Sequence, residues 1–250
     1  MAGTPLLTPA IVLGSLRYAE SSRIVRLATR EYGVQSAIAK GALRPRSRFG
    51  AALQLLSEGH AHLLPSRSSD LHTLVAFDLV ATHSGLARNL ERFGAASALA
   101  EVATRFVPPV ANLALYDQLR HDVELIELAP PDAIRVVALR AMWRLIIELG
   151  LGPTVSRCVR DAVSLPAGAV ALSLREGGFL CAACAGLGAT TRLGPQDRAD
   201  LVALLGSHLE LPLLTDRQAA AHRRLLVRWI WEHLGDTSMP ALESWSAARS

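Results

Sequence analysis

The chain has 250 residues, of which 50% are hydrophobic and 19% are charged, a composition that excludes extensive disorder and allows one large domain or two smaller ones. No basic segment precedes the first apolar run, and no apolar stretch reaches the ~18 residues of a membrane span. Three clustered cysteines are too few for a disulfide framework, so we expect a protein of the reducing cytoplasm.

The net charge of +4 is unevenly distributed along the chain. Residues 1–70 hold nine basic and four acidic side chains, a net +5, which leaves −1 for residues 71–250. Such asymmetry favours a polyanionic partner for the first segment, although a simple solubility bias gives the same numbers.

The first third of the sequence has the alternating pattern of short strands separated by polar turns. A five-stranded barrel in about 75 residues is the size of an OB-fold. The expected strands are 10–18, 23–30, 34–42, 53–64 and 72–82.

After residue 83 the apolar spacing changes to three and four residues, which predicts helices. We therefore expect an α+β protein with an OB-fold at 1–82 and a mainly helical domain at 83–250. The expected helices are 86–106, 112–128, 131–149, 195–208 and 216–234, followed by a loose tail of about 15 residues. Residues 154–190, rich in Gly and Ala, predict a cysteine-containing insert with a β-hairpin across Gly177-Gly178.

A basic loop, Lys40–Gly50, lies between two expected strands of the barrel. In an extended backbone Arg44, Arg46 and Arg48 would project to one side, where guanidinium groups can contact successive phosphates. Phe49 could stack on a base, and Tyr18 or Tyr32 could do the same. The alternative is a solvated basic hairpin with Phe49 in the core.

The cysteines suggest half of a zinc knuckle at Cys181-x-x-Cys184 and a second pair at Cys158-x-x-Asp161. Zinc accepts a carboxylate in place of a thiolate, so a Zn²⁺ site of three cysteines and one aspartate is possible. The alternative is a degenerate site with reduced, buried cysteines and no metal.

Enzymatic motifs are missing from the sequence: it contains no P-loop, no GxSxG and no HExxH. Glu58, His60 and His62 would line one face of a strand and could hold a metal, although period-two polar residues are also typical of an exposed strand face. We therefore expect a protein that is not an enzyme.

The ordered set of these segments resembles the RecO family of DNA-repair recombination mediators. The strongest match is Ala39–Gly50 with the following Leu53-Gln54-Leu55; weaker ones are the opening 11–25, the hairpin Arg175–Cys184 and the helix His222–Leu234. Phe77-Asp78-Leu79 falls where a helix of the family begins. Asp161 departs from the family pattern, in which complete sites carry a cysteine.

The resemblance implies binding and annealing of single-stranded DNA, and loading of recombinase on strands coated by single-strand-binding protein, together with RecR. We expect the DNA-binding residues on the barrel to be Arg17, Arg23, Lys40, Arg44, Arg46, Arg48 and Phe49. The implied location is the cytoplasm, in association with the nucleoid, without a membrane partner.

The family also binds the acidic C-terminal tail of single-strand-binding protein on its helical domain. Arg135, Arg140 and Arg144 are the expected contacts here, and Arg140 and Arg144 share a helix face at i,i+4. A solvated helix face is the alternative for these arginines. Two other functions stay open: a zinc-containing adaptor or transcriptional module without annealing activity, and a metal-dependent hydrolase using Glu58, His60 and His62.

Overall fold

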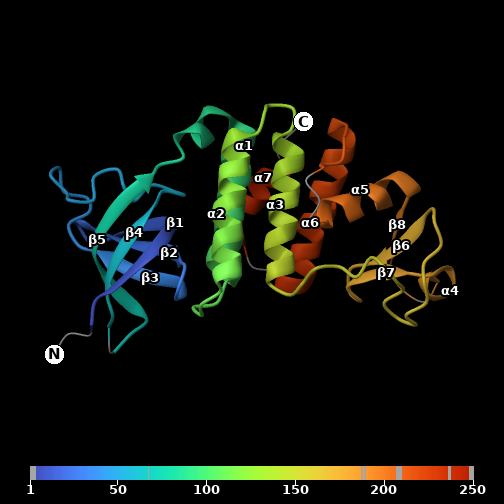
Figure 1. The fold of residues 1–250 in the computed structure, drawn as a ribbon, viewed down its shortest axis with the longest axis horizontal. Coiled ribbons are helices and arrows are strands. Elements are labelled where there is room, and N and C mark those ends of the chain that lie inside the picture. Colours follow the sequence, from blue (N-terminus) through green and yellow to red (C-terminus); the bar gives the residue numbers. More distant parts are fainter. Residues whose placement is uncertain are drawn as a thin grey trace. The chain divides into compact units, whose positions relative to one another are not determined.

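The computed structural model describes residues 4–66, 68–186, 188, 190–206, 210–235 and 238–247. The chain forms two compact units, Met1–Leu128 and Ala129–Ser250, which are described separately (Figure 1). The first unit contains the barrel and also two helices that follow it. The expected domain boundary after residue 82 falls inside this unit and stays a prediction.

The first unit is built on a closed five-stranded barrel with the strand order β1-β2-β3-β5-β4, as expected for an OB-fold. Strand β1 pairs with both β2 and β4 and thereby closes the barrel, while β3 and β5 form the one parallel pair among the described strands. The strands are β1 Leu6–Tyr18, β2 Ser22–Thr29, β3 Gly33–Ala39, β4 Glu58–Leu64 and β5 Leu71–Ala81.

The barrel core follows the period-two pattern of the sequence, because alternate residues of a strand point to the same face. Its members include Val25, Leu27, Leu63 and Leu74, none of which is exposed. Strand β4 begins later than expected, since residues 49–56 form turns whose apolar side chains pack inward.

A close backbone contact fixes the start of β4 at Gly59. A Cβ atom at this position would lie 2.4 Å from the main-chain oxygen of Asp78, so only glycine fits without a shift. The register of β4 against β5 slips between Glu58 and Gly59. Residues 77–79 belong to strand β5, as the alternating pattern predicted and not as the start of a helix that the resemblance implied, because they pair with β4.

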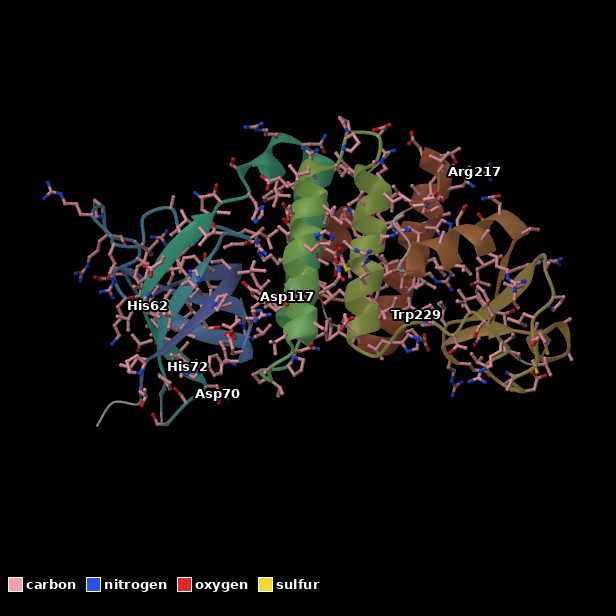
Figure 2. All side chains as sticks on the ribbon, viewed as in Figure 1. His62, Asp70, His72, Asp117, Arg217 and Trp229 are labelled. Atoms are coloured by element: carbon pink, nitrogen blue, oxygen red, sulfur yellow. The ribbon has the colours of Figure 1, made fainter. Side chains whose placement is uncertain are left out.

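Helices α1 (Leu90–Phe106) and α2 (Leu113–Leu128) follow the barrel after a short 3₁₀ turn, η1 (Ser84–Arg88). The Asn89 side chain caps α1 by accepting a hydrogen bond from the Arg92 amide at 3.1 Å. Arg30, the residue after β2, forms a bidentate ion pair with Asp117 at 2.9–3.0 Å. Asp117 belongs to α2 and is labelled in Figure 2. This contact connects the barrel to its helices within the unit.

A buried charged network lies where the barrel meets η1. His83 contacts the Glu58 carboxylate at 2.9 Å and the Glu127 carboxylate at 2.5 Å, and Arg120 donates to the second oxygen of Glu58 at 2.9 Å. The hydrogen bond to Glu58 raises the pKa of His83 despite burial. Burial opposes ionisation of Glu58, but the hydrogen bonds from His83 and Arg120 outweigh it and lower the pKa of that carboxyl.

The second unit combines helices with a small three-stranded sheet of order β7-β6-β8. The expected hairpin at Gly177-Gly178 is present as β6 and β7, while β8 was not expected. The elements are α3 Ile134–Glu148, β6 Val170–Ser173, β7 Gly178–Leu180, α4 Ala182–Ala185, β8 Thr191–Leu193, α5 Pro195–Leu205, α6 Asp216–Leu234 and α7 Pro240–Ala247.

Tryptophans organise the core of this unit. Trp143 of α3 and Trp229 of α6 meet edge to face at 5.9 Å, and the Trp229 indole donates to the Leu151 carbonyl at 2.9 Å. The expected loose tail is wrong for residues 240–247, which form α7, because Leu242 and Trp245 are buried. No helix in the described part of the chain is long and apolar enough to cross a membrane.

We predict that the buried network makes the stability of the first unit depend on pH. A raised His83 pKa contributes stability that is complete below its ordinary value of 6.5 and is lost as the pH rises through the folded value. His83→Asn, which tolerates the left-handed backbone at this position, should remove this dependence and lower the free energy of unfolding near pH 6 by about 3 kcal/mol.

The measurement is hydrogen exchange by mass spectrometry, read on peptides from β4, β5 and α2 between pH 6 and 9 and corrected for intrinsic exchange. His60→Asn is the matched control, since His60 is on the same strand as Glu58 and is exposed. An unchanged pH dependence in His83→Asn would contradict the prediction.

Candidate nucleic-acid interface and cysteine cluster

The basic loop is a series of tight turns and not an extended segment, so the spacing argument for its three arginines was wrong. Amide-to-carbonyl hydrogen bonds of three-residue separation connect Arg44 to Gly41, Ser47 to Arg44 and Gly50 to Ser47. Gly41 and Gly50 adopt φ angles of 72° and 48°, which favour glycine. Proline and glycine thus bend the loop back toward the barrel.

The cations of this loop are nevertheless exposed. Lys40, Arg44, Arg46 and Arg48 all face solvent, and no carboxylate among the described residues forms an ion pair with them. Phe49, expected in the DNA-binding set, is only 2% exposed and packs in the barrel core. This burial leaves no ring face for a base, so the loop contributes charge and not stacking.

Arg17 and Arg23 lie beside the loop at the same end of the barrel. They are direct cross-strand partners in β1 and β2, and Arg23 donates to the Ser15 hydroxyl at 3.0 Å. The loop joins this hairpin through the Leu43 amide, which donates to the Ser21 carbonyl at 2.9 Å. We name the six exposed or half-exposed cations the barrel basic cluster: Arg17, Arg23, Lys40, Arg44, Arg46 and Arg48.

Tyr18 is the aromatic residue that the structure places next to the barrel basic cluster. It ends β1 opposite Ser22 and is 48% exposed, with the exposed Leu16 two residues before it. The sequence offered Tyr18 and Tyr32 as equal alternatives to Phe49, and only the burial pattern separates them.

Two other cations of the first unit have carboxylate partners. Arg30 is paired with Asp117, and its hydrogen bond lowers the pKa of that carboxyl. Arg120 is paired with Glu58. The barrel basic cluster has no such described partner, and within it like charges such as Arg17 and Arg23 stand opposite each other. An anionic ligand would relieve that repulsion.

The three arginines expected to bind a partner have different environments on α3. Arg140 is 5% exposed and donates to the Ala203 and Glu210 carbonyls, so it holds the chain between α5 and α6 in place. Arg135 forms an ion pair with the exposed Asp216, and Arg144 is half-buried. Arg135 also borders a pocket of about 390 Å³ lined mainly by Val136 and residues 211–214.

The four residues of the cysteine cluster come together as the sequence predicted. One ligand atom each from Cys158, Asp161, Cys181 and Cys184 lies within 4.8 Å of all the others. The turn after Cys158 is closed by its hydrogen bond from Ala162, whose φ of 61° is unusual for a residue other than glycine. Ligands 2.3 Å from a tetrahedral ion are about 3.8 Å apart, so the cluster is near enough to bind a metal.

Asp161 is the acceptor at the centre of this cluster. The thiols of Cys181 and Cys184 approach its Oδ2 at 3.2 and 3.3 Å. Hydrogen bonds, first from Cys158, hold the pKa of Asp161 below its usual range, while burial raises the pKa of the Cys184 thiol to about 12. A metal ion would therefore have to displace thiol protons, which makes its binding stronger as the pH rises.

The third expected constellation does not form. Glu58 is buried and bound to His83, His60 is exposed, and His62 is paired with Asp78 at 2.6 Å. The register slip after Glu58 separates it from the two histidines. His83 itself was not predicted, because its partners are 25 and 44 residues away and no local motif marks them.

These features define a protein with an OB-fold barrel, a cationic end on that barrel, and a helical unit carrying a small cysteine-containing sheet. The family model "Recombination protein O N terminal" matches residues 1–83, and "Recombination protein O C terminal" matches residues 87–243. The chain belongs to the RecO family.

Three relatives illustrate the similarity, and each is named DNA repair protein RecO. The protein of Anaeromyxobacter dehalogenans is 33% identical over 90% of both chains. That of Geobacter metallireducens is 33% identical over 77% of both chains. That of Exiguobacterium sibiricum is 34% identical over 68% of this chain and 67% of its own.

We predict that the two aromatic residues at the loop end of the barrel contribute very differently to the stability of the first unit. Phe49→Ala should lower the free energy of unfolding of the first unit by about 3 kcal/mol, because it empties a core position. Tyr18→Ala should change it by less than about 0.5 kcal/mol, because the ring is largely exposed. The measurement is urea denaturation. Tyr18→Ala removes a fluorescent tyrosine, so unfolding of both variants is followed by far-UV circular dichroism. Equal losses in both variants would contradict the assignment.

Proposed function

We propose that this DNA repair protein binds single-stranded DNA at the barrel basic cluster and anneals complementary strands. The observation that carries the proposal is a group of exposed cations, without described counter-ions, at one end of an OB-fold barrel. The proposal assigns DNA binding to residues 1–82 and partner binding to residues 83–250. The family membership and the names of the relatives support a role in DNA repair.

The proposed mechanism is electrostatic and involves no covalent step. Guanidinium groups contact successive phosphates and release counter-ions, which gives affinity without sequence preference. Neutralised strands repel each other less, so two bound or adjacent strands pair more readily. Tyr18 offers a stacking surface for one base beside the phosphate track.

Replacement of Arg44, Arg46 and Arg48 by alanine together should weaken binding of single-stranded DNA. The slope of log affinity against log salt should become shallower by about two, the value for loss of three phosphate contacts on a single strand. The measurement is fluorescence anisotropy of a labelled oligonucleotide at several salt concentrations, with annealing of complementary strands followed by energy transfer.

The matched control changes Arg88, Arg175 and Arg217 to alanine, which alters the net charge equally at exposed positions that do not belong to the loop. Equal loss in both triple variants would mean that only total charge matters. Retained binding in the Arg44, Arg46 and Arg48 variant would place the DNA elsewhere. If the wild-type protein did not bind at low salt, the adaptor function without annealing would replace this proposal.

We also propose that the cysteine cluster binds Zn²⁺ as a structural ion. The three thiols and one carboxylate within bonding reach support it, since zinc accepts both donors. Bound zinc would crosslink the turn after Cys158 to the one after Cys181, and Cys158 and Cys184 would supply buried thiolates. Asp161 would provide the fourth, exposed position.

Asp161→Cys should bind Zn²⁺ at least about tenfold more tightly than the wild type, and Cys184→Ser should lose most of the affinity. Competition with a chromophoric chelator measures both, and affinity should rise with pH as thiol protons are displaced. Asp70→Cys adds an exposed thiol in the other unit and is the control. Wild-type affinity in Cys184→Ser would rule out the cluster.

The third part of the proposal concerns partners, namely RecR and the acidic tail of single-strand-binding protein. The tail would bind on the second unit at the pocket bordered by Arg135 and lined by the apolar residues 211–214. The buried Arg140 would act as a positioning residue through its bonds to main-chain carbonyls, and the half-buried Arg144 would add charge.

Arg135→Ala should weaken binding of a labelled tail peptide about tenfold, the equivalent of one charge-assisted hydrogen bond of about 1.4 kcal/mol. Asp216→Asn should strengthen binding, because it removes a negative charge that pairs with Arg135 and lines the same pocket. Isothermal titration calorimetry measures both, with Arg217→Ala as the control on α6. Effects of the same sign in both variants would contradict this site.

A further inference from the structure

A second group of metal-ligating side chains lies in the second unit, apart from the cysteine cluster. Asp197 and Asp200 are on α5, one helical turn apart, and His222 is on α6. One ligand atom from each lies within 4.8 Å of the other two. The sequence predicted no metal site at these residues, because α5 and α6 bring them together only in the folded chain.

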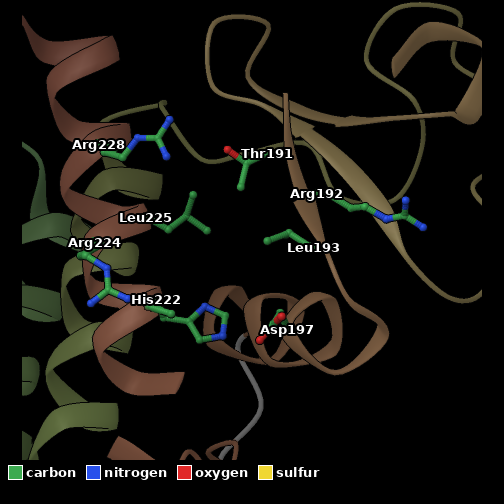
Figure 3. A pocket seen from close by; sticks show the side chains of 9 residues that line it. Thr191, Arg192, Leu193, Asp197, His222, Arg224, Leu225 and Arg228 are labelled. Atoms are coloured by element: carbon green, nitrogen blue, oxygen red, sulfur yellow. The ribbon is translucent and has the colours of Figure 1, made fainter. Parts of the chain in front are cut away.

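His222 is the unusual member of this group. It is only 3% exposed, yet neither of its ring nitrogens has a hydrogen-bond partner among the described residues. Figure 3 shows its ring directed across the space between α6 and α5, toward the Asp197 carboxylate. Burial of a polar group without a partner is unfavourable by about 1–3 kcal/mol, so an unpaired buried imidazole indicates a missing ligand.

Asp200 is equally buried, and its carboxylate is held in position by two amides. Gln196 donates to Oδ1 at 2.8 Å, and Gln218 of α6 donates to Oδ2 at 3.3 Å. Such outer contacts are typical of metal sites, where they orient the ligating carboxylate. The Asp200 Oδ2 and His222 Nε2 atoms are 4.0 Å apart, within the ~4.2 Å that two ligand atoms on one ion can span.

We propose that Asp197, Asp200 and His222 form a divalent metal site that joins α5 to α6. One imidazole and two carboxylates favour Zn²⁺, Mn²⁺, Fe²⁺ or Co²⁺ over Ca²⁺ and Mg²⁺, which prefer oxygen ligands alone. Two carboxylates neutralise the ion. Its remaining positions face a pocket of about 310 Å³ lined in part by Thr191 and Leu225.

Cations line the same pocket and oppose this site to some extent. Arg192, Arg224 and Arg228 are all exposed, so water and salt screen their repulsion of a bound ion. The buried carboxylate of Asp200 is screened much less, and its attraction for the ion is correspondingly stronger. Attraction by the buried carboxylate therefore outweighs repulsion by the exposed arginines at the buried end of the pocket.

Titration of the metal-stripped full chain with Co²⁺ distinguishes this site from the cysteine cluster. Cobalt on thiolates gives an intense near-ultraviolet charge-transfer band, whereas cobalt on nitrogen and oxygen gives visible absorption alone. We expect both signals, with Mn²⁺ binding only at the proposed site and raising the melting temperature of the second unit, followed by its tryptophans.

Asp197→Asn should weaken Mn²⁺ binding at least about tenfold while the charge-transfer band of cobalt is unchanged. Asp197 is half-buried, so this variant retains the fold even if the fully buried His222→Gln does not. Arg228 lines the same pocket but is not a proposed ligand, so Arg228→Gln should bind Mn²⁺ at least as well as the wild type. Asp161→Asn should alter the charge-transfer band alone.

Wild-type protein that binds no Mn²⁺ and gives only the thiolate-type cobalt signal would overturn the proposal. Asp197→Asn with wild-type Mn²⁺ affinity would overturn it as well. Neither result bears on DNA binding by the barrel basic cluster, which is measured by a separate assay.

Discussion

Closure of the barrel by β1 is the constraint on which the first unit depends. This strand of thirteen residues pairs with β2 through residues 10–18 and with β4 through residues 6–11. The sheet therefore has no free edge. Within the barrel, the antiparallel order of β1, β2 and β3 brings the β1–β2 turn and the loop after β3 to one end. The barrel basic cluster is a consequence of this topology, because its cations come from the β1–β2 hairpin and from the loop that begins at Lys40.

The barrel also buries one carboxylate, that of Glu58, near the start of η1. Glu58 begins β4 at a register slip, beside a glycine that the β5 backbone requires. A buried carboxylate is stable only with partners, and His83 and Arg120 supply them from two elements that follow the barrel. Helix α2 is therefore electrostatically connected to the barrel, and the two lie in one compact unit.

The second unit uses polar groups for connection in a similar way. Arg140 is buried on α3 and bonds to main-chain carbonyls near α5 and α6, and the cysteine cluster closes two turns of the small sheet. Asp200 and His222 repeat this pattern between α5 and α6, except that the imidazole has no described partner. The family membership indicates a role in DNA repair. These contacts show which polar side chains are engaged within the unit and which are open to a ligand.

The sequence by itself determined the OB-fold strands, most helices, the hairpin with its cysteines, and the RecO resemblance, because periodicity and short motifs are local properties. Tertiary structure decided which side chains are available. The sequence left Phe49 open as a stacking residue or a core residue, and packing buries it. Arg140 was expected on a surface and is also buried, whereas Tyr18 is left exposed where β1 ends. His83, and the group around His222, depend on contacts between distant segments, and the tail became a helix because Trp245 found a core to enter. Burial and long-range pairing are properties of the folded chain, and no local pattern encodes them.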